Sequence, residues 1–136
     1  MRLYPVMVLQ LQPMQAPKPQ PIRSSKENWP EVFGEEAFKA LGCSVTVTTA
    51  DGSCGTKGFV TDALPDDYSY FYTCGPEPML RAVYREAKTS GQFSFEERMG
   101  CGFGACMGCS CKTVTGYKRI CADGPVLRRE EILWAD

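Results

Sequence analysis

The chain has 136 residues, of which 43% are hydrophobic and 23% are charged, enough to bury the core of one ordinary domain or of two small ones. Its formal net charge of −1 provides no general basic surface, so we expect neither nucleic acid nor a membrane as its partner. The sequence contains no histidine, which excludes Ser-His-Asp and Cys-His nucleophiles, His-ligated zinc and Rieske centres.

Residues 1–21 form an atypical N-terminal segment that prolines and glutamines interrupt. Residues 3–12 predict a short strand, and residues 13–28 predict a loop. The interrupted apolar run does not fit a signal peptide, and no window reaches the length of a membrane span. We therefore expect a cytoplasmic protein, in which thiols stay reduced and clustered cysteines bind metal rather than form disulfides.

Residues 22–90 alternate between helical and strand patterns around a glycine-rich loop at 50–58. The patterns predict helices over 30–41, 59–64 and 76–91 and strands over 43–49 and 69–74. Such alternation is typical of an α/β layer with parallel strands. Because the stretch is too short for a full doubly wound sheet, we interpret it as a partial nucleotide-binding layer, the second half of such a sheet.

From Gly91 onward the sequence becomes rich in strand patterns. A glycine- and cysteine-rich loop occupies residues 100–109, and a β-hairpin is expected to turn at Gly116. The predicted strands cover 93–99, 110–116, 117–122 and 125–127, with a last helical turn over 129–134. We interpret residues 91–136 as a small β-rich module built around its cysteines.

Four of the eight cysteines follow the spacing C-x4-C-x2-C-x11-C, namely Cys101, Cys106, Cys109 and Cys121. Three thiolates at C-x4-C-x2-C with one distant partner are the plant-type pattern for a [2Fe–2S] cluster. Glycines between the first three cysteines give the loop the positive φ angles and close approach that wrapping a cluster requires. The spacing therefore predicts a [2Fe–2S] cluster with these four metal ligands.

Other interpretations of the cysteines stay open at this point. A four-cysteine zinc site is one, although such sites usually contain two C-x2-C pairs and only Cys106 and Cys109 form one here. Cys111 is an alternative ligand to Cys109, but we expect it to pack as a small buried hydrophobe. Met99, Phe103 and Met107 flank the ligands, and we expect them to pack beneath the loop, with an apolar contact surface as the alternative.

A second candidate site lies where the strand over 69–74 meets the following helix, at Cys74-Gly75-Pro76. Ligands of open α/β sheets bind outside the carboxyl ends of strands, and the loop 51–56 follows the preceding strand at the same edge. The sequence thus predicts cofactor binding by Cys74, Gly75 and Pro76, with a plain strand-to-helix turn as the alternative.

Three segments carry a resemblance to a known family: YTCGPEPMLRAV at 72–83, FEERMGCGFGACMGCSCKT at 95–113 and YKRICADGPV at 117–126. With them, the stretch from about Ile22 to Trp134 resembles the C-terminal part of the electron-transfer subunit of dihydroorotate dehydrogenase B, in the ferredoxin–NADP reductase superfamily. The β-barrel and the glycine-rich phosphate loop with which that family begins are not visible in this sequence.

The resemblance implies a non-catalytic subunit of an NAD-dependent oxidoreductase in pyrimidine biosynthesis. Such a subunit carries FAD and a [2Fe–2S] cluster, and it relays electrons to NAD⁺ from an FMN-containing catalytic subunit that oxidises dihydroorotate. Residues 22–90 would be the second half of a ferredoxin-reductase-like NAD domain. By motif, the cluster ligands are Cys101, Cys106, Cys109 and Cys121, and the residues near flavin and nicotinamide are Cys74, Gly75 and Pro76.

The missing barrel keeps three further hypotheses open. The chain is a stand-alone ferredoxin-like carrier without flavin, a zinc-stabilised interaction module, or a truncated remnant. Binding of FAD by the chain would favour the role implied by the family over a flavin-free carrier. Zinc in place of iron and sulfide would favour the interaction module.

Overall fold

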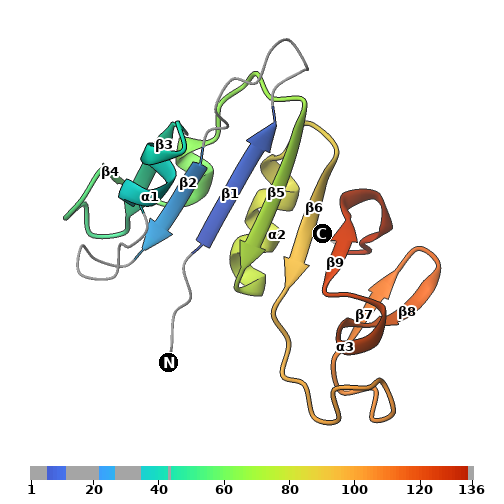
Figure 1. The fold of residues 1–136 in the computed structure, drawn as a ribbon. Coiled ribbons are helices and arrows are strands. Elements are labelled where there is room, and N and C mark those ends of the chain that lie inside the picture. The colour runs from blue at the N-terminus through green and yellow to red at the C-terminus, as the bar shows by residue number, and fades with distance from the viewer. Residues whose placement is uncertain (1–5, 12–21, 27–34, 43, 135–136) are drawn as a thin grey trace.

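The computed structural model describes residues 6–11, 22–26, 35–42 and 44–134. These residues form a seven-stranded sheet in the order β4-β3-β2-β1-β5-β6-β9 and a separate hairpin of β7 and β8 (Figure 1). The strands are β1 (Val6–Leu11), β2 (Ile22–Lys26), β3 (Val45–Thr49), β4 (Thr56–Lys57), β5 (Tyr70–Gly75), β6 (Gly91–Phe95), β7 (Ser110–Thr113), β8 (Gly116–Arg119) and β9 (Val126–Arg128).

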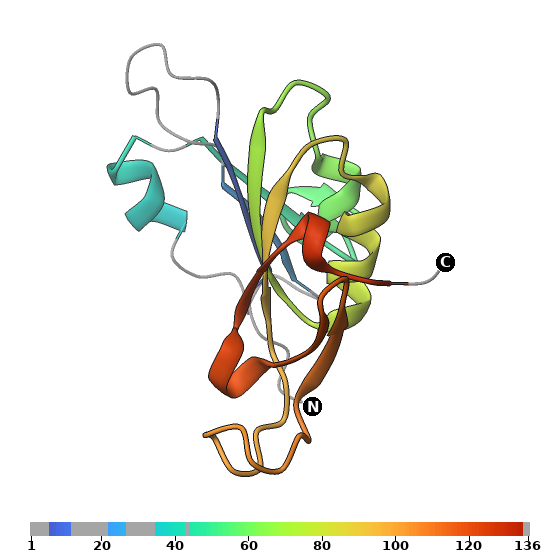
Figure 2. The same ribbon diagram turned by 90° about the vertical axis from the view of Figure 1, so that its right-hand side faces the viewer.

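Helices flank the sheet on both faces. The helices are α1 (Glu35–Ala40), α2 (Glu77–Glu86) and α3 (Ile120–Asp123), with short 3₁₀ turns η2 (Val60–Ala63) and η3 (Arg129–Glu131). Figure 2 shows α1 and α2 on opposite faces of the sheet, with the cysteine loop below it. Within the described residues, no helix combines the length and apolar character needed to cross a bilayer.

Strand direction places the ends of several strands at one edge. The pairs β2–β3 and β5–β6 are parallel. The central strand β1 runs antiparallel to both of its neighbours, β2 and β5. It follows that β2, β3, β5 and β6 all point the same way, so that their carboxyl ends share one edge while β1 ends at the other.

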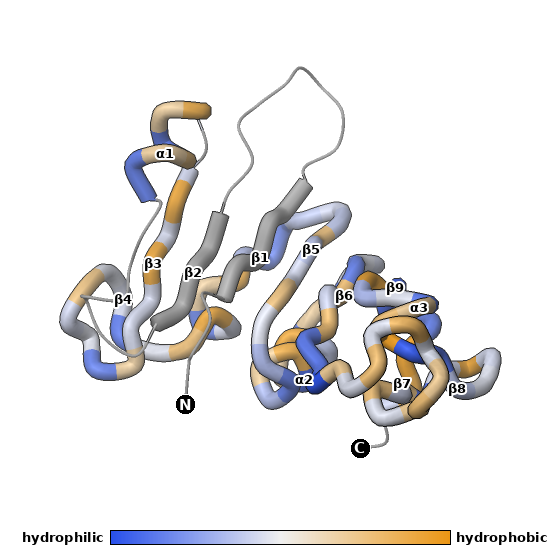
Figure 3. The backbone as a smooth tube through the Cα atoms, turned by 60° about the horizontal axis from the view of Figure 1, so that its bottom comes forward, coloured by the Kyte–Doolittle hydropathy of each residue, from blue (hydrophilic) through white to orange (hydrophobic). Residues whose placement is uncertain are grey.

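The core lies where α2 packs on β5 and β6 (Figure 3). Leu80 and Val83 recur at helical spacing on α2 and are fully buried, as the sequence pattern predicts. Phe71 on β5 and Phe93 on β6 stack edge to face, with ring centroids 5.3 Å apart. Trp134 lies 5.7 Å from Phe93, so the end of the chain is packed onto the same core.

Several sequence predictions hold, and four are corrected. The strand predicted over 3–12 is confirmed as β1, and the predicted hairpin is confirmed as β7 and β8, with its turn at residues 114–115 and Gly116 as the first residue of β8. The strand predicted over 93–99 is wrong at 96–99, because β6 ends at Phe95 and the chain continues into the cysteine loop. The loop predicted over 13–28 is wrong at 22–26, where β2 forms through parallel pairing with β3. Such pairing is set by tertiary contacts and leaves little signal in a short polar strand. Residues 13–21 and 30–34 lie outside the described residues.

The helix predicted over 76–91 ends at Glu86, and Gly91 begins β6 instead of ending the helix. A Cβ on Gly91 would lie 2.3 Å from the ring of Phe71, so this glycine makes room for a core aromatic. The strand predicted over 117–122 also ends early, because α3 starts at Ile120. The Ile120 N–H donates to the Cys109 carbonyl and turns the chain there.

We expect Phe93→Ala to lower the free energy of unfolding by about 3–5 kcal/mol, because a fully buried ring is replaced by a cavity. Chemical denaturation followed by circular dichroism measures the loss. The matched control is Tyr117→Ala, since Tyr117 is 67% exposed and its removal should change stability by less than about 0.5 kcal/mol. Equal losses in the two variants would contradict the position of Phe93 in the core.

Candidate metal centre

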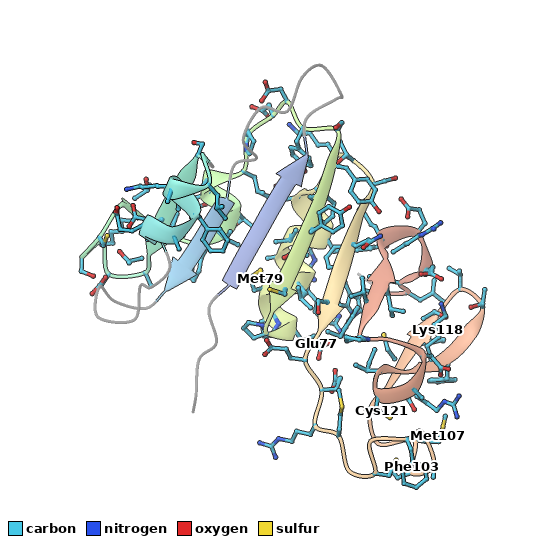
Figure 4. All side chains as sticks on the ribbon, in the orientation of Figure 1. Glu77, Met79, Phe103, Met107, Lys118 and Cys121 are labelled. Carbon is cyan, nitrogen blue, oxygen red and sulfur yellow. The ribbon has the colours of Figure 1, made fainter. Side chains whose placement is uncertain are left out.

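The four predicted metal ligands come from two neighbouring segments beyond the carboxyl end of β6. Cys101, Cys106 and Cys109 lie on the loop between β6 and β7, and Cys121 lies on α3 directly after β8. Figure 4 shows Phe103 and Met107 at the tip of the loop, with Cys121 above them in this view. The structure thus brings all four predicted ligands to one end of the molecule.

The four thiols are arranged as two pairs. The thiol of Cys101 interacts with that of Cys106, and the thiol of Cys109 interacts with that of Cys121. Backbone groups reinforce both pairs, because the N–H of Gly108 lies 3.4 Å from the Cys106 Sγ and the N–H of Cys121 lies 3.4 Å from the Cys109 Sγ. Among the described residues, no three cysteine or acidic side chains converge on a single metal-ion position.

Backbone N–H groups around the sulfurs favour the thiolate form that binds metal. The N–H of Cys106, followed by that of Phe103, lowers the pKa of the Cys101 thiol to about 6. The N–H of Cys121 is the main cause of the lowered pKa of Cys109. The pKa of Cys121 is raised, chiefly by its neighbour Cys109, as expected when two thiolates share one small space.

The loop is seated on α3 through a single buried glycine. Gly104 has φ +90°, a backbone conformation that glycine adopts without strain. A Cβ at this position would lie 3.1 Å from the Cβ of Ala122 on α3. The close approach of loop and helix brings Cys101 near the fourth thiol, Cys121.

This donor set fits a binuclear cluster. A [2Fe–2S] centre takes its four protein ligands as thiolates, which two thiol pairs with inward-directed N–H groups provide. A mononuclear zinc site instead needs four ligands around one point. When bound, the cluster would supply one-electron redox chemistry, and the chain would supply its ligands and their hydrogen bonds.

The apolar residues beside the ligands do not pack beneath the loop, which corrects the expectation from the sequence. Met99, Phe103 and Met107 are 51%, 74% and 49% exposed. Gly104 is the loop residue that packs against α3, and the larger side chains of Phe103 and Met107 lie at the surface. The alternative interpretation, an apolar contact surface around the cluster, is the one that their exposure supports.

Cys111 stands apart from the two thiol pairs. It lies on β7, is partly buried against the hydrophobic core, and agrees with the prediction that it packs as a small apolar residue. Burial raises the pKa of its thiol, and the charged groups that act on it are Glu97, Glu77 and Arg81. Cys111 therefore faces α2 rather than the cysteine loop.

The second candidate site is at the carboxyl end of β5. Gly75 has φ +147°, and Pro76 is the cap from which α2 begins. The loop 51–56 lies at the same edge, where Thr49 exchanges two hydrogen bonds with the backbone of Cys54, 2.8 and 3.1 Å long. In the sheet, β2 and β1 separate this loop from β5, so the structure does not bring the two parts of the predicted site together.

The centre of the sheet does not fit a dinucleotide in the usual way. Doubly wound sheets bind pyrophosphate at a strand-to-helix turn at the carboxyl end of a central strand. Here the central strand β1 starts beside Cys74, through the pair Met7–Cys74, and ends beside Tyr70, through the pair Leu11–Tyr70. It therefore provides no strand-to-helix turn next to Cys74-Gly75-Pro76.

Comparison with known proteins identifies the cysteine loop and its surroundings. Residues 96–133 match the iron–sulfur cluster binding domain of dihydroorotate dehydrogenase B. The chain is 47% identical over 113 residues to the dihydroorotate dehydrogenase B (NAD(+)) electron transfer subunit of Shouchella clausii and 51% identical over 104 residues to that of Lysinibacillus sphaericus. This chain is a homologue of such electron-transfer subunits. The matches cover 76% and 69% of this chain but 42% and 39% of the two relatives, so it spans about two fifths of their length.

A solved structure supports the same relationship. The chain aligns with a protein whose structure was described as "Insights into flavin-based electron bifurcation via the NADH-dependent reduced ferredoxin-NADP oxidoreductase structure". The TM-score is 0.68 at 27% identity, covering 82% of this chain and 43% of that protein. The fold is thus that of a ferredoxin–NADP reductase-like protein with an iron–sulfur binding domain, as the resemblance in the sequence implied.

The residues that hold the loop against α3 were not predicted from the sequence. Arg119 donates from Nε and Nη2 to the carboxylate of Asp123, at 2.8 and 3.1 Å. Its Nη1 also donates to the Gly104 carbonyl at 3.3 Å. The available signal was an Arg and an Asp four residues apart on either side of Cys121, which is the spacing of a helical ion pair.

We expect the Cys101 thiol of reduced, cluster-free protein to react with iodoacetamide along a pH profile centred near 6, because its lowered pKa leaves it ionised at neutral pH. Cys111 should react only at a pH above the usual thiol range, since its pKa is raised. Peptide mass spectrometry after timed alkylation at several pH values measures both. The denatured chain is the control, and identical profiles for the two thiols in the folded protein would show that the loop does not ionise Cys101.

Proposed function

We propose that this chain is the iron–sulfur part of an electron-transfer subunit, with Cys101, Cys106, Cys109 and Cys121 as ligands of a [2Fe–2S] cluster. The observation that carries the proposal is the arrangement of these cysteines as two thiol pairs within the segment that matches the iron–sulfur cluster binding domain. Two iron atoms joined by sulfide need two thiolates each, whereas one zinc ion needs four at one point.

The electrons would pass between an FMN-containing dihydroorotate dehydrogenase catalytic subunit and FAD and NAD⁺, in pyrimidine biosynthesis. The relatives are named as electron transfer subunits of dihydroorotate dehydrogenase B (NAD(+)), which supports this role. The exposed side chains of Phe103 and Met107 at the loop tip would contact the catalytic subunit. The chain's part is to hold the cluster close to that contact, because electron transfer requires proximity.

We also propose that the chain consists of the two domains that its sequence predicts, preceded by an N-terminal segment. Residues 22–90 form a partial nucleotide-binding α/β domain, the second half of a ferredoxin-reductase-like NAD domain, and residues 91–136 form the cluster module. Cys74, Gly75 and Pro76 would lie near a flavin or nicotinamide that other parts of the assembly help to hold. The N-terminal segment 1–21 has no assigned role.

A second candidate is a ferredoxin-like carrier that works without flavin. The specific observation in its favour is the direction of β1, which leaves the described residues without a pyrophosphate-binding turn beside Cys74. The two candidates share the cluster and differ in whether a flavin takes part in the electron transfer.

Replacing Cys106 by serine should remove the cluster, because one iron would lose one of its two thiolates. After anaerobic reconstitution, we expect the iron and acid-labile sulfide content of Cys106→Ser to fall to a small fraction of the wild-type value, together with the visible absorption. Cys111→Ser is the matched control and should keep both, since Cys111 faces α2. A wild-type spectrum in Cys106→Ser would refute the ligand assignment.

Flavin titration tests whether this chain holds FAD without the other parts of an assembly. We expect the isolated chain not to quench FAD fluorescence at equal, low micromolar concentrations, because β1 supplies no phosphate turn at the carboxyl edge of the sheet. The cluster-loaded chain is titrated, with free FAD in buffer as the control. Saturable one-to-one binding by the isolated chain would contradict this expectation and rule out the second candidate.

A further inference from the structure

Arg119 lies at the junction between the cysteine loop and the segment that carries the fourth ligand. It is the last residue of β8 and the cap of α3, two positions before Cys121. Its guanidinium is held in a fork on Asp123 by bonds of 2.8 and 3.1 Å, and its backbone N–H donates to the same carboxylate at 2.9 Å. This ion pair fixes the direction of the arginine side chain.

The remaining end of the guanidinium reaches across to the loop. Nη1 of Arg119 donates to the carbonyl of Gly104 at 3.3 Å. The backbone of the same glycine also lies close enough to the Cys121 sulfur to act on it. Gly104 is therefore held by Arg119 through its carbonyl and lies beside the fourth thiol. A Cβ at this glycine would lie 2.9 Å from the Arg119 Nη1, which shows how closely the two are packed.

The charge of Arg119 also lies close to thiolates from the second pair. Its guanidinium interacts electrostatically with the sulfurs of both Cys109 and Cys121. Reduction adds one negative charge to a cluster that is already anionic, and a fixed positive charge nearby favours the reduced form. Asp123 offsets part of this charge, and the side chain of Arg119 is 38% exposed, so solvent weakens the effect.

Resting on the proposed [2Fe–2S] function, we propose that Arg119 is a positioning residue for the cluster, which clamps the Gly104 loop onto α3 and places a fixed positive charge beside Cys109 and Cys121. The clamp keeps the thiol pair on the loop close to the pair that includes Cys121. The charge sets the reduction potential at a higher value than the thiolates alone would give.

The chain offers a matched control in the adjacent residue. Lys118 carries the same charge, but its Nζ pairs with Glu131 at 2.6 Å. Figure 4 shows Lys118 well away from the loop tip that carries Phe103 and Met107. Lys118→Gln removes one positive charge from the module without removing a bond to the loop.

The test compares wild-type protein, Arg119→Gln, Arg119→Lys and Lys118→Gln after anaerobic reconstitution. Redox titration gives the midpoint potential, and iron release to a chelator gives the cluster lifetime. For Arg119→Gln we expect the ratio of reduced to oxidised cluster at the wild-type midpoint to fall about three- to tenfold, where tenfold corresponds to about 59 mV for one electron. We also expect iron release to be several-fold faster.

Arg119→Lys separates the role of the charge from the role of the clamp. Lysine keeps the positive charge, but it lacks the planar guanidinium that bonds to Asp123 and Gly104 at the same time. We expect a potential near that of wild type with faster iron release, and wild-type behaviour of Lys118→Gln in both measurements. The inference is overturned if Arg119→Gln keeps both wild-type values, or if Lys118→Gln shifts the potential equally. Wild-type protein that takes up no cluster would instead refute the proposed function itself.

Arg119 variants that take up no cluster also test the inference, provided that their fold is measured. If Arg119→Gln and Arg119→Lys both fail to load while their cluster-free forms keep the wild-type circular dichroism and thermal midpoint, Arg119 is needed for assembly of the site, as proposed. If their failure comes with loss of the fold, Arg119 serves the fold rather than the cluster and the inference is wrong.

Discussion

The arrangement of the site depends on one short contact between two backbone segments. At this contact the N–H of Ile120 donates to the Cys109 carbonyl, and the N–H of Cys121 is directed at the Cys109 sulfur. Ile120 and Cys109 are 0% and 2% exposed, so the contact is anchored in the core. Because Cys109 belongs to the loop and Cys121 to α3, this junction fixes the distance between ligands that are twelve residues apart. The position of the other thiol pair, Cys101 and Cys106, then depends only on the loop itself and on the packing of Gly104 against α3.

The sheet determines where this junction stands. Strand β6 leads directly toward the cysteine loop, and β9 returns along it in antiparallel pairing, so both ends of the module are tied to the same strand. Trp134 packs on Phe93 and Phe95 and holds the end of the chain to the same core. The cysteine loop is thereby held beyond the carboxyl edge that also carries Cys74 and Gly75. Cluster chemistry and any flavin chemistry would meet at this edge, which is where open α/β sheets bind their ligands.

The sequence was informative where the chemistry is local and uninformative where distant segments meet. Cysteine spacing was sufficient to predict that Cys101, Cys106, Cys109 and Cys121 lie at one end of the molecule, because loop length and glycine content are local properties. The periodicity of Leu80 and Val83 was sufficient to place α2. Gly91 was predicted to be a helix terminator, but its role is to admit the ring of Phe71, a partner twenty residues away. The direction of β1 and the existence of β2 depend on pairing across the sheet. Arg119 likewise acts through Gly104, fifteen residues earlier, and no local pattern indicates that contact.

The proposed electron-transfer function depends on a binuclear iron–sulfur cluster in this chain. Electron paramagnetic resonance of the dithionite-reduced, anaerobically reconstituted wild-type chain, with metal and sulfide analysis of the same sample, tests it most directly. A binuclear cluster predicts about two iron and two sulfide per chain with a spin-half signal of about one spin per cluster. About one zinc per chain, without sulfide and without a signal after reconstitution, would contradict it and favour a structural metal site.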